Sequence, residues 1–132
     1  MERRKINPWR WSEALGFDQA VEAIGPQRIL FCSGQSSVDA DGKPMHVDNM
    51  LAQTIQSLDN LATVLEAAGY TPADVVRLDF FATDIDALWA VMEDFGRYAE
   101  SKGWQTSSGT LMGVSRLAQP ELMVEIGATA VQ

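Results

Sequence analysis

The chain has 132 residues and a mass of 14.5 kDa, which suits one domain with one hydrophobic core. Hydrophobic residues make up 46% and charged residues 21%, which excludes a disordered or fibrous chain. Four of the ten basic residues lie in the first ten positions, so the rest of the chain holds six basic and seventeen acidic side chains, a net charge of −11. That charge repels a phosphodiester backbone, and no nucleic-acid partner is expected.

The cysteine content and the hydropathy indicate the cellular compartment of the protein. Cys32 is alone and cannot form an internal disulfide, so it is interpreted as a small buried hydrophobe. No apolar run approaches the roughly 18 residues needed to span a bilayer, and the first residues lack the apolar stretch typical of a secretory signal. We therefore expect a cytoplasmic protein with no membrane partner.

The first elements are an arm and two strands. Residues 1–16 carry Trp9 and Trp11 without a sustained period, which predicts an irregular arm that lies against other parts of the molecule. Residues 17–24 alternate apolar and polar side chains, and residues 28–33 form a short apolar run. Both segments are predicted strands.

A helix of about five turns is predicted between Asp48 and Gly69, because apolar residues recur there three or four positions apart and Gly69 suits a C-cap. We expect its polar face to point away from the sheet. That face consists of Gln53, Gln56, Asp59, Asn60, Thr63 and Glu66.

The second half predicts a strand over residues 75–83, a helix that Asp84 caps, and strands over 110–116 and 122–131. The order is that of an α+β fold: a single-layer sheet with two helices packed on one face, in one domain over residues 17–132.

The last predicted strand has no clearly polar face. Leu122, Val124, Ile126 and Ala128 alternate with Met123, Glu125, Gly127 and Thr129. An antiparallel sheet with water on one side normally shows cleaner alternation. We therefore expect other copies of the chain to cover the second face, in a symmetric oligomer.

Several segments resemble the RidA (YjgF, or L-PSP endoribonuclease-like) family, over nearly the whole of residues 17–131. They are Phe17-x-Gln-Ala-Val21, Leu30–Gln35, Asp39–Lys43, Gln53–Leu61, Val64–Gly69, Phe81-x-Thr-Asp84, Val114-x-Arg-Leu117 and Val124–Ile126. The resemblance implies a chorismate-mutase-like fold and a homotrimer with a central β-barrel. It also implies small-molecule sites in the clefts between subunits.

The resemblance also implies site residues, and several depart from the family pattern. Deaminating members clamp the carboxylate of an imino acid with an arginine, for which bidentate geometry is the physical reason, but Gly109 stands at that position here. Phe17 replaces the usual tyrosine, Leu111 the usual cysteine and Met92 an asparagine. Glu125 matches the acid that positions water, although a glutamate on a sheet face is more often solvated or paired at an interface.

Ser33 and the backbone of Gly34 match further substrate-binding positions, so two functions stay open. The first is hydrolysis of an enamine or imine that no arginine–carboxylate pair holds, with Glu125 as the acid–base group. The second is a trimeric binding protein without turnover. Ribonuclease activity, which has been described for some family members, is disfavoured by the acidic charge.

Other chemistries find little support in the residues. A triad of Ser33, His46 and an acid is possible on paper, but a lone loop histidine is more often a surface residue. One histidine and one cysteine do not supply a metal site, and no dinucleotide motif is present, so no metal or cofactor is expected.

Three tryptophans have two interpretations. Trp9, Trp11 and Trp104 either pack the arm and a loop, or form a lid over an apolar cleft that also contains Phe17.

Overall fold

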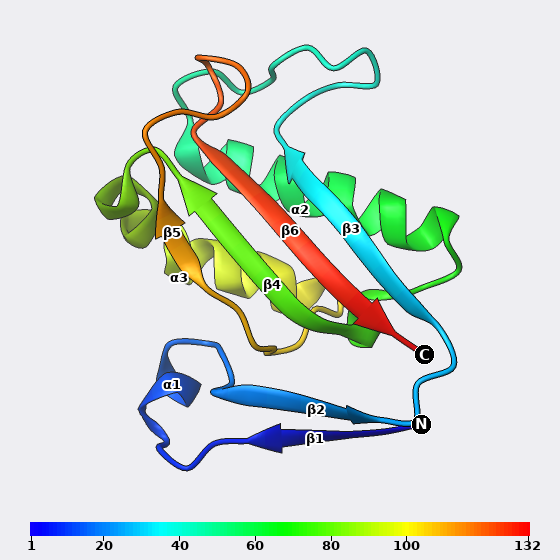
Figure 1. Ribbon diagram of the computed structural model, residues 1–132. Helices are drawn as coiled ribbons and strands as arrows, with labels where there is room; N and C mark the ends of the chain where they lie inside the picture. Colours follow the sequence, from blue (N-terminus) through cyan, green and yellow to red (C-terminus); the bar gives the residue numbers. More distant parts are fainter.

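The computed structural model describes residues 1–132, and its main layer is a four-stranded sheet with the order β3-β6-β4-β5 (Figure 1). The strands are β3 (Ile29–Ser36), β4 (Val75–Ala82), β5 (Leu111–Gly113) and β6 (Val124–Val131). The central strand β6 is antiparallel to both β3 and β4. Strand β5 is parallel to β4, which the connection through a helix between them permits.

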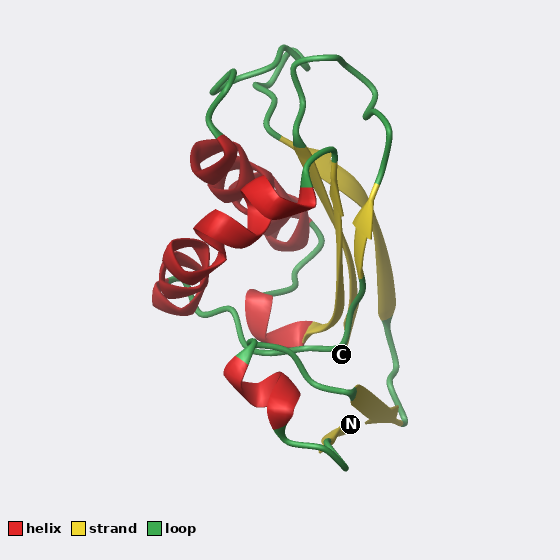
Figure 2. Cartoon of the chain, turned by 90° about the vertical axis from the view of Figure 1, so that its left-hand side faces the viewer, coloured by secondary structure: helices red, strands yellow, loops and turns green.

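Two long helices, α2 (Met50–Ala67) and α3 (Ile85–Ser101), cover one face of this sheet and leave the other face open (Figure 2). Asp84 caps α3 as predicted, since its side chain accepts a hydrogen bond from Ala87 N. Asn49 caps α2 in the same way through Ala52 N. Gly69 follows α2 with φ +80°, the left-handed conformation that suits glycine after a helix. None of the helices has the length and apolar character needed to cross a membrane.

The core lies between the two helices and the sheet. Leu58, Leu61 and Leu65 of α2 are fully buried, and so is Ile126 on the face of β6 that they contact. Trp104 is 7% exposed and belongs to this core, so it packs a loop and does not form part of a lid.

Gln53 corrects the prediction for the polar face of α2, because its side chain is fully buried. Its Nε2 donates to the carbonyl of Glu121 at 2.9 Å, and its Oε1 accepts from the backbone N–H of Met123 at 2.8 Å. A buried amide with partners on both ends avoids the cost of desolvation. Gln53 thereby fixes the loop that leads into β6.

The arm over residues 1–16 is more regular than expected. It contains strand β1 (Glu2–Ile6) and the short helix α1 (Trp11–Ala14), and β1 pairs with β2 (Ala20–Ile24) in a separate two-stranded sheet. The prediction of one sheet was therefore wrong for residues 17–24. Arg4 of β1 forms an ion pair with Glu22 of β2 at 2.8 Å, which adds a cross-strand contact to this small sheet.

Asp74 joins this small sheet to the body of the molecule. It lies in a short 3₁₀ turn, η1 (Pro72–Asp74), where its carboxylate accepts from the Thr71 backbone at 2.8 Å and from Gln132 Nε2 at 3.0 Å. Arg3 of β1 forms an ion pair with it at 3.4 Å. Burial by itself raises the pKa of Asp74, but these hydrogen bonds and the charge of Arg3 outweigh burial and lower that pKa.

Tyr98 links α3 to α2, because its hydroxyl donates to Asp59 Oδ1 at 2.7 Å. This hydrogen bond, burial and the negative charge of Asp59 raise the pKa of Tyr98 to about 12. A raised pKa in the folded state stabilises the fold below the ordinary tyrosine value, and that stabilisation is lost as the pH rises towards 12.

We therefore expect the wild type to lose more stability between pH 8 and pH 11 than Tyr98→Phe loses. Urea unfolding of both proteins at the two pH values measures the difference, and lysine titration affects both equally. Equal losses would contradict the assignment.

Candidate functional site

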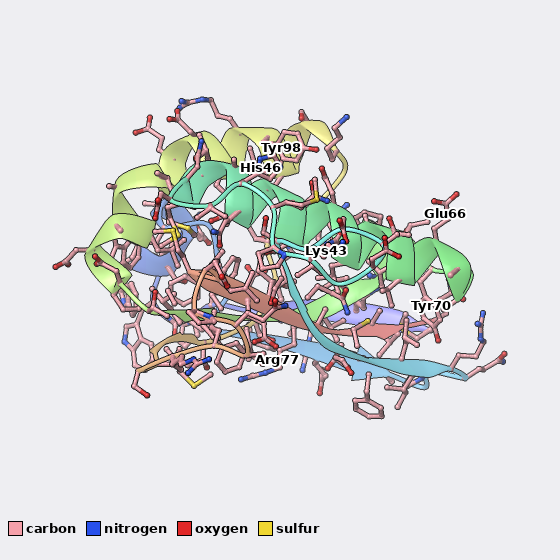
Figure 3. All side chains as sticks on the ribbon, turned by 90° about the horizontal axis from the view of Figure 1, so that it is seen from above. Lys43, His46, Glu66, Tyr70, Arg77 and Tyr98 are labelled. Carbon is pink, nitrogen blue, oxygen red and sulfur yellow. The ribbon has the colours of Figure 1, made fainter.

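The open face of the sheet carries the polar and aromatic residues that the helices do not cover. The register places Phe31 and Arg77 on either side of Thr129, Asp79 beside Gly127, and Phe81 beside Glu125. Figure 3 shows the labelled Arg77 on the side of the sheet away from the helices. Phe31 is 77% exposed, an unusual state for a phenylalanine.

Glu125 and Gly34 form the tightest contact on this face. The pairing of β3 with β6 shifts register between Cys32 and Gln35, a bulge that includes Ser33 and Gly34. A Cβ at position 34 would overlap Glu125 Oε1 and lie 2.7 Å from its Cγ. The glutamate side chain thus takes the space that only a glycine leaves free.

A hollow of about 290 Å³ lies beside this contact. Its lining comprises Phe31, Cys32, Gly34, Asp79, Phe81, Glu125, Gly127, Ala128 and Thr129. Gly127 has open space where a side chain would stand, so it leaves room on the floor of the hollow. Burial raises the pKa of the Cys32 thiol, which therefore stays protonated at neutral pH and is not a thiolate nucleophile.

One border of the hollow is an ion pair within β4. Arg77 donates through Nε to Asp79 Oδ2 at 2.9 Å, and its Nη2 lies 2.9 Å from Asp79 Oδ1. Asp79 Oδ1 also accepts from the backbone N–H of Thr110 at 3.0 Å. This network holds the segment before β5 against β4.

Gly109 lies in that segment, where its neighbours Ser108 and Thr110 bond to the backbone of β4 through the N–H groups of Leu78 and Phe80. A Cβ at Gly109 would overlap the carbonyl oxygen of Leu78 and lie 2.8 Å from its carbon. This backbone therefore has no space for any side chain at position 109, and the arginine clamp is excluded by geometry as well as by sequence.

The structure does not bring all the predicted site residues together. Ser33, Gly34 and Glu125 lie together at the bulge. Met92 and Leu111 pack against the hydrophobic clusters on the helix side of the sheet.

The remaining candidates from the sequence lie in other environments. Phe17 packs edge-on against Trp11 of α1, with ring centroids 5.7 Å apart. His46 is exposed in a loop, and Figure 3 shows it beside the helices.

Sequence reasoning missed part of the hollow. Asp79 and Phe81 belong to the strand predicted over residues 75–83, but nothing in the sequence marks them as site residues. Gly127 was the available signal, because a glycine inside a strand often marks a place where a ligand approaches. Phe31 carried no signal, since a phenylalanine in an apolar run is normally buried.

Comparisons with known proteins agree with this architecture. Residues 13–132 match the model of the family described as endoribonuclease L-PSP. A RutC family protein of Pyrococcus horikoshii is 32% identical over 129 residues, which cover 89% of this chain and 96% of the relative. The 2-iminobutanoate/2-iminopropanoate deaminase of Escherichia coli is 27% identical over 128 residues, covering 92% and 98%.

The fold comparison agrees as well. A crystal structure of YyfB, a Rid family protein of unknown function from Yersinia pestis, superposes with a TM-score of 0.87 at 40% identity, covering 100% of both chains. The α+β fold predicted from the resemblance is confirmed. With the family model matched over residues 13–132, the chain belongs to the Rid (YjgF) family, also described as endoribonuclease L-PSP.

Proposed function

We propose that the protein hydrolyses an imine or enamine to a carbonyl compound and ammonia, at Glu125. One observation carries the proposal. The Glu125 carboxylate lies over Gly34, lines the hollow, and forms no hydrogen bond or ion pair within the chain. It is therefore free to orient a water molecule. Ser33 and the backbone of Gly34 are proposed to bind the substrate beside it.

The reaction needs only a general acid–base group, because a protonated imine carbon is already electrophilic. Glu125 accepts a proton from water as the water oxygen bonds to the imine carbon, which gives a carbinolamine. Glu125 then returns that proton to nitrogen and accepts the hydroxyl proton as the C–N bond breaks, so that the carbonyl forms and ammonia leaves. Ammonia takes up the second proton and becomes ammonium. Water and the iminium ion give a carbonyl compound and ammonium, so no further reactant is required.

The name of the Escherichia coli relative supports this class of reaction, but Gly109 argues against the same substrate. We expect little activity on 2-iminopropanoate. Each lost charge-assisted hydrogen bond to a carboxylate costs roughly 1.5–3 kcal/mol, about tenfold or more in binding.

An assay that generates imines in place from a panel of amines and amino acids, and follows loss of imine against a semicarbazide trap, tests both expectations. If the protein accelerates the hydrolysis of none of these imines, the proposed function is contradicted. Turnover of 2-iminopropanoate equal to that of an arginine-bearing relative contradicts the prediction about Gly109.

A binding protein without turnover is the second candidate, favoured by the missing arginine at position 109. It predicts a ligand that binds stably in the hollow and leaves unchanged. Binding without conversion in the same panel distinguishes it from the enzyme.

The open face supports a further part of the proposal, a homotrimer. Phe31 is 77% and Ile29 53% exposed, and both lie on the edge strand β3. An unpaired edge with exposed apolar side chains favours association. We propose that neighbouring copies cover this face and border the hollow.

We expect light scattering to give the mass of three chains at micromolar concentration, and Phe31→Glu to shift the protein towards monomer. A wild type that stays at 14.5 kDa contradicts the trimer.

A further inference from the structure

The side chains that line the hollow carry negative charge, whereas binding the carboxylate of an imino acid requires positive charge. It contains two carboxylates, Asp79 and Glu125, and two aromatic side chains, Phe31 and Phe81, but no lysine, arginine or histidine. A ligand carboxylate placed here meets like charge. A ligand cation is attracted by the carboxylates and by aromatic rings.

The neighbouring Arg77 does not reverse this charge. Both of its contacts with Asp79, Nε to Oδ2 and Nη2 to Oδ1, are 2.9 Å long, so its charge is matched by that carboxylate. Glu125 has no such partner. The three groups together therefore leave one net negative charge beside the hollow.

Position 109 offers no compensation on the other side. The backbone there excludes any side chain. The flanking polar side chains are neutral and already bonded: the Ser108 hydroxyl donates to the Val76 carbonyl at 2.7 Å, and the Thr110 hydroxyl accepts from Arg77 at 3.2 Å. Within one chain, neither the hollow nor its border thus holds a free cation for a ligand carboxylate.

Resting on the proposed function, we propose that the substrate is a positively charged imine without a carboxylate, the iminium ion of a primary amine in place of that of an amino acid. The negative hollow favours the protonated imine, which is the form that water attacks. The volume of about 290 Å³ is at the lower end for small-molecule sites, so the ligand is small. Hydrolysis of such an imine releases an aldehyde or ketone with ammonium.

Binding is tested first with three stable probes that share one skeleton. 2-Phenylethylamine carries the cation alone, phenylalanine adds a carboxylate, and 2-phenylethanol is neutral. Isothermal titration of the wild type is expected to show the amine binding about tenfold or more tightly than the other two. Equal affinities, tighter binding of phenylalanine, or no binding of the amine overturns the proposal.

Two variants tie that binding to the hollow. Gly127→Ala adds a methyl group where nothing lies within 4 Å, so the fold is kept while the floor of the hollow is filled. Asp79→Asn keeps an oxygen for the Thr110 N–H but removes the charge that matches Arg77. We expect both to weaken amine binding about tenfold, and Asp79→Asn also to narrow the preference over phenylalanine.

Gly96→Ala is the matched control, since Gly96 too has nothing within 4 Å of the position of an added methyl group but is an exposed residue of α3, away from the hollow. We expect it to bind the amine as the wild type does. Unchanged amine binding in Gly127→Ala and Asp79→Asn places the ligand elsewhere and overturns the proposal.

Turnover separates this inference from the proposed function. A flavin amine oxidase makes the imine of 2-phenylethylamine, and an amino-acid oxidase makes the imino acid of phenylalanine, so the two substrates differ only in the carboxylate. We expect the protein to accelerate hydrolysis of the first imine over its rate without protein, and to leave the hydrolysis rate of the imino acid unchanged. Faster hydrolysis of the imino acid overturns the inference and leaves the proposed function standing. Tight amine binding without turnover of either imine overturns the proposed function and, with it, the assignment of a substrate, and it leaves the hollow as a binding site for amines.

Discussion

Glu125→Gln is expected to lower kcat for imine hydrolysis by roughly 10²–10⁴ at saturating substrate, because glutamine keeps the shape of the side chain but cannot accept a proton from water. The amide still fits over Gly34, where the glutamate side chain occupies the place of a Cβ. The fold and the oligomer are therefore expected to persist. Turnover and light scattering on one preparation of the variant measure both properties.

Glu66→Gln is the matched control, since Glu66 is an exposed residue near the end of α2 (Figure 3). It removes the same charge far from the hollow and should leave kcat unchanged. Two results at position 125 argue against an acid–base role. One is an intact oligomer with normal turnover, and the other is a loss of activity that only follows a loss of assembly.

Gly109→Ala is expected to lower the free energy of unfolding by about 1–3 kcal/mol or more, because the added methyl group overlaps the Leu78 carbonyl oxygen. The overlap is with backbone, which cannot rotate away as a side chain does. Relief requires the segment before β5 to move off β4 and to give up its bonds to Leu78 and Phe80. Urea unfolding of the variant measures the cost.

The same reasoning applies to arginine at this position. We expect Gly109→Arg to destabilise the fold and not to restore turnover of imino acids, whatever charge it adds. Gly96→Ala provides the contrast, since alanine in an exposed helix stabilises by about 0.5–1 kcal/mol. A Gly109→Ala protein as stable as the wild type would show that the segment before β5 moves at little cost in free energy, and would contradict this prediction.

The elements that were predicted well are those that short-range chemistry determines. The period of three to four residues before Gly69 predicts α2, and Asp84 predicts the start of α3, because spacing and capping act within a few residues. The apolar and small residues on both faces of β6 are likewise read from the alternation of side chains along one strand.

The parts that were missed depend on distant partners. Alternation predicts that residues 17–24 form a strand, but it does not say that β1 will be the neighbour. Gln53 reads as polar and exposed until a loop nearly seventy residues later supplies its hydrogen bonds.

The candidate site was predicted in part for the same reason. Glu125 and Gly34 were found through family motifs, whereas Asp79 and Phe31 enter the hollow only once β3, β6 and β4 are paired in register. The spacing of Arg77 and Asp79 shows a shared face, but not that the two bond to each other.

The contact between Gly34 and Glu125 has a consequence for the descent of this chain. Alanine at position 34 would overlap the Glu125 side chain, which no hydrogen bond holds in place and which can therefore rotate away from the bulge. A lineage that acquires alanine at position 34 thus keeps its acid but moves the carboxylate from its place over the bulge. Relatives that rely on the acid at this place should therefore retain glycine at position 34, whereas position 125 can change while the glycine stays.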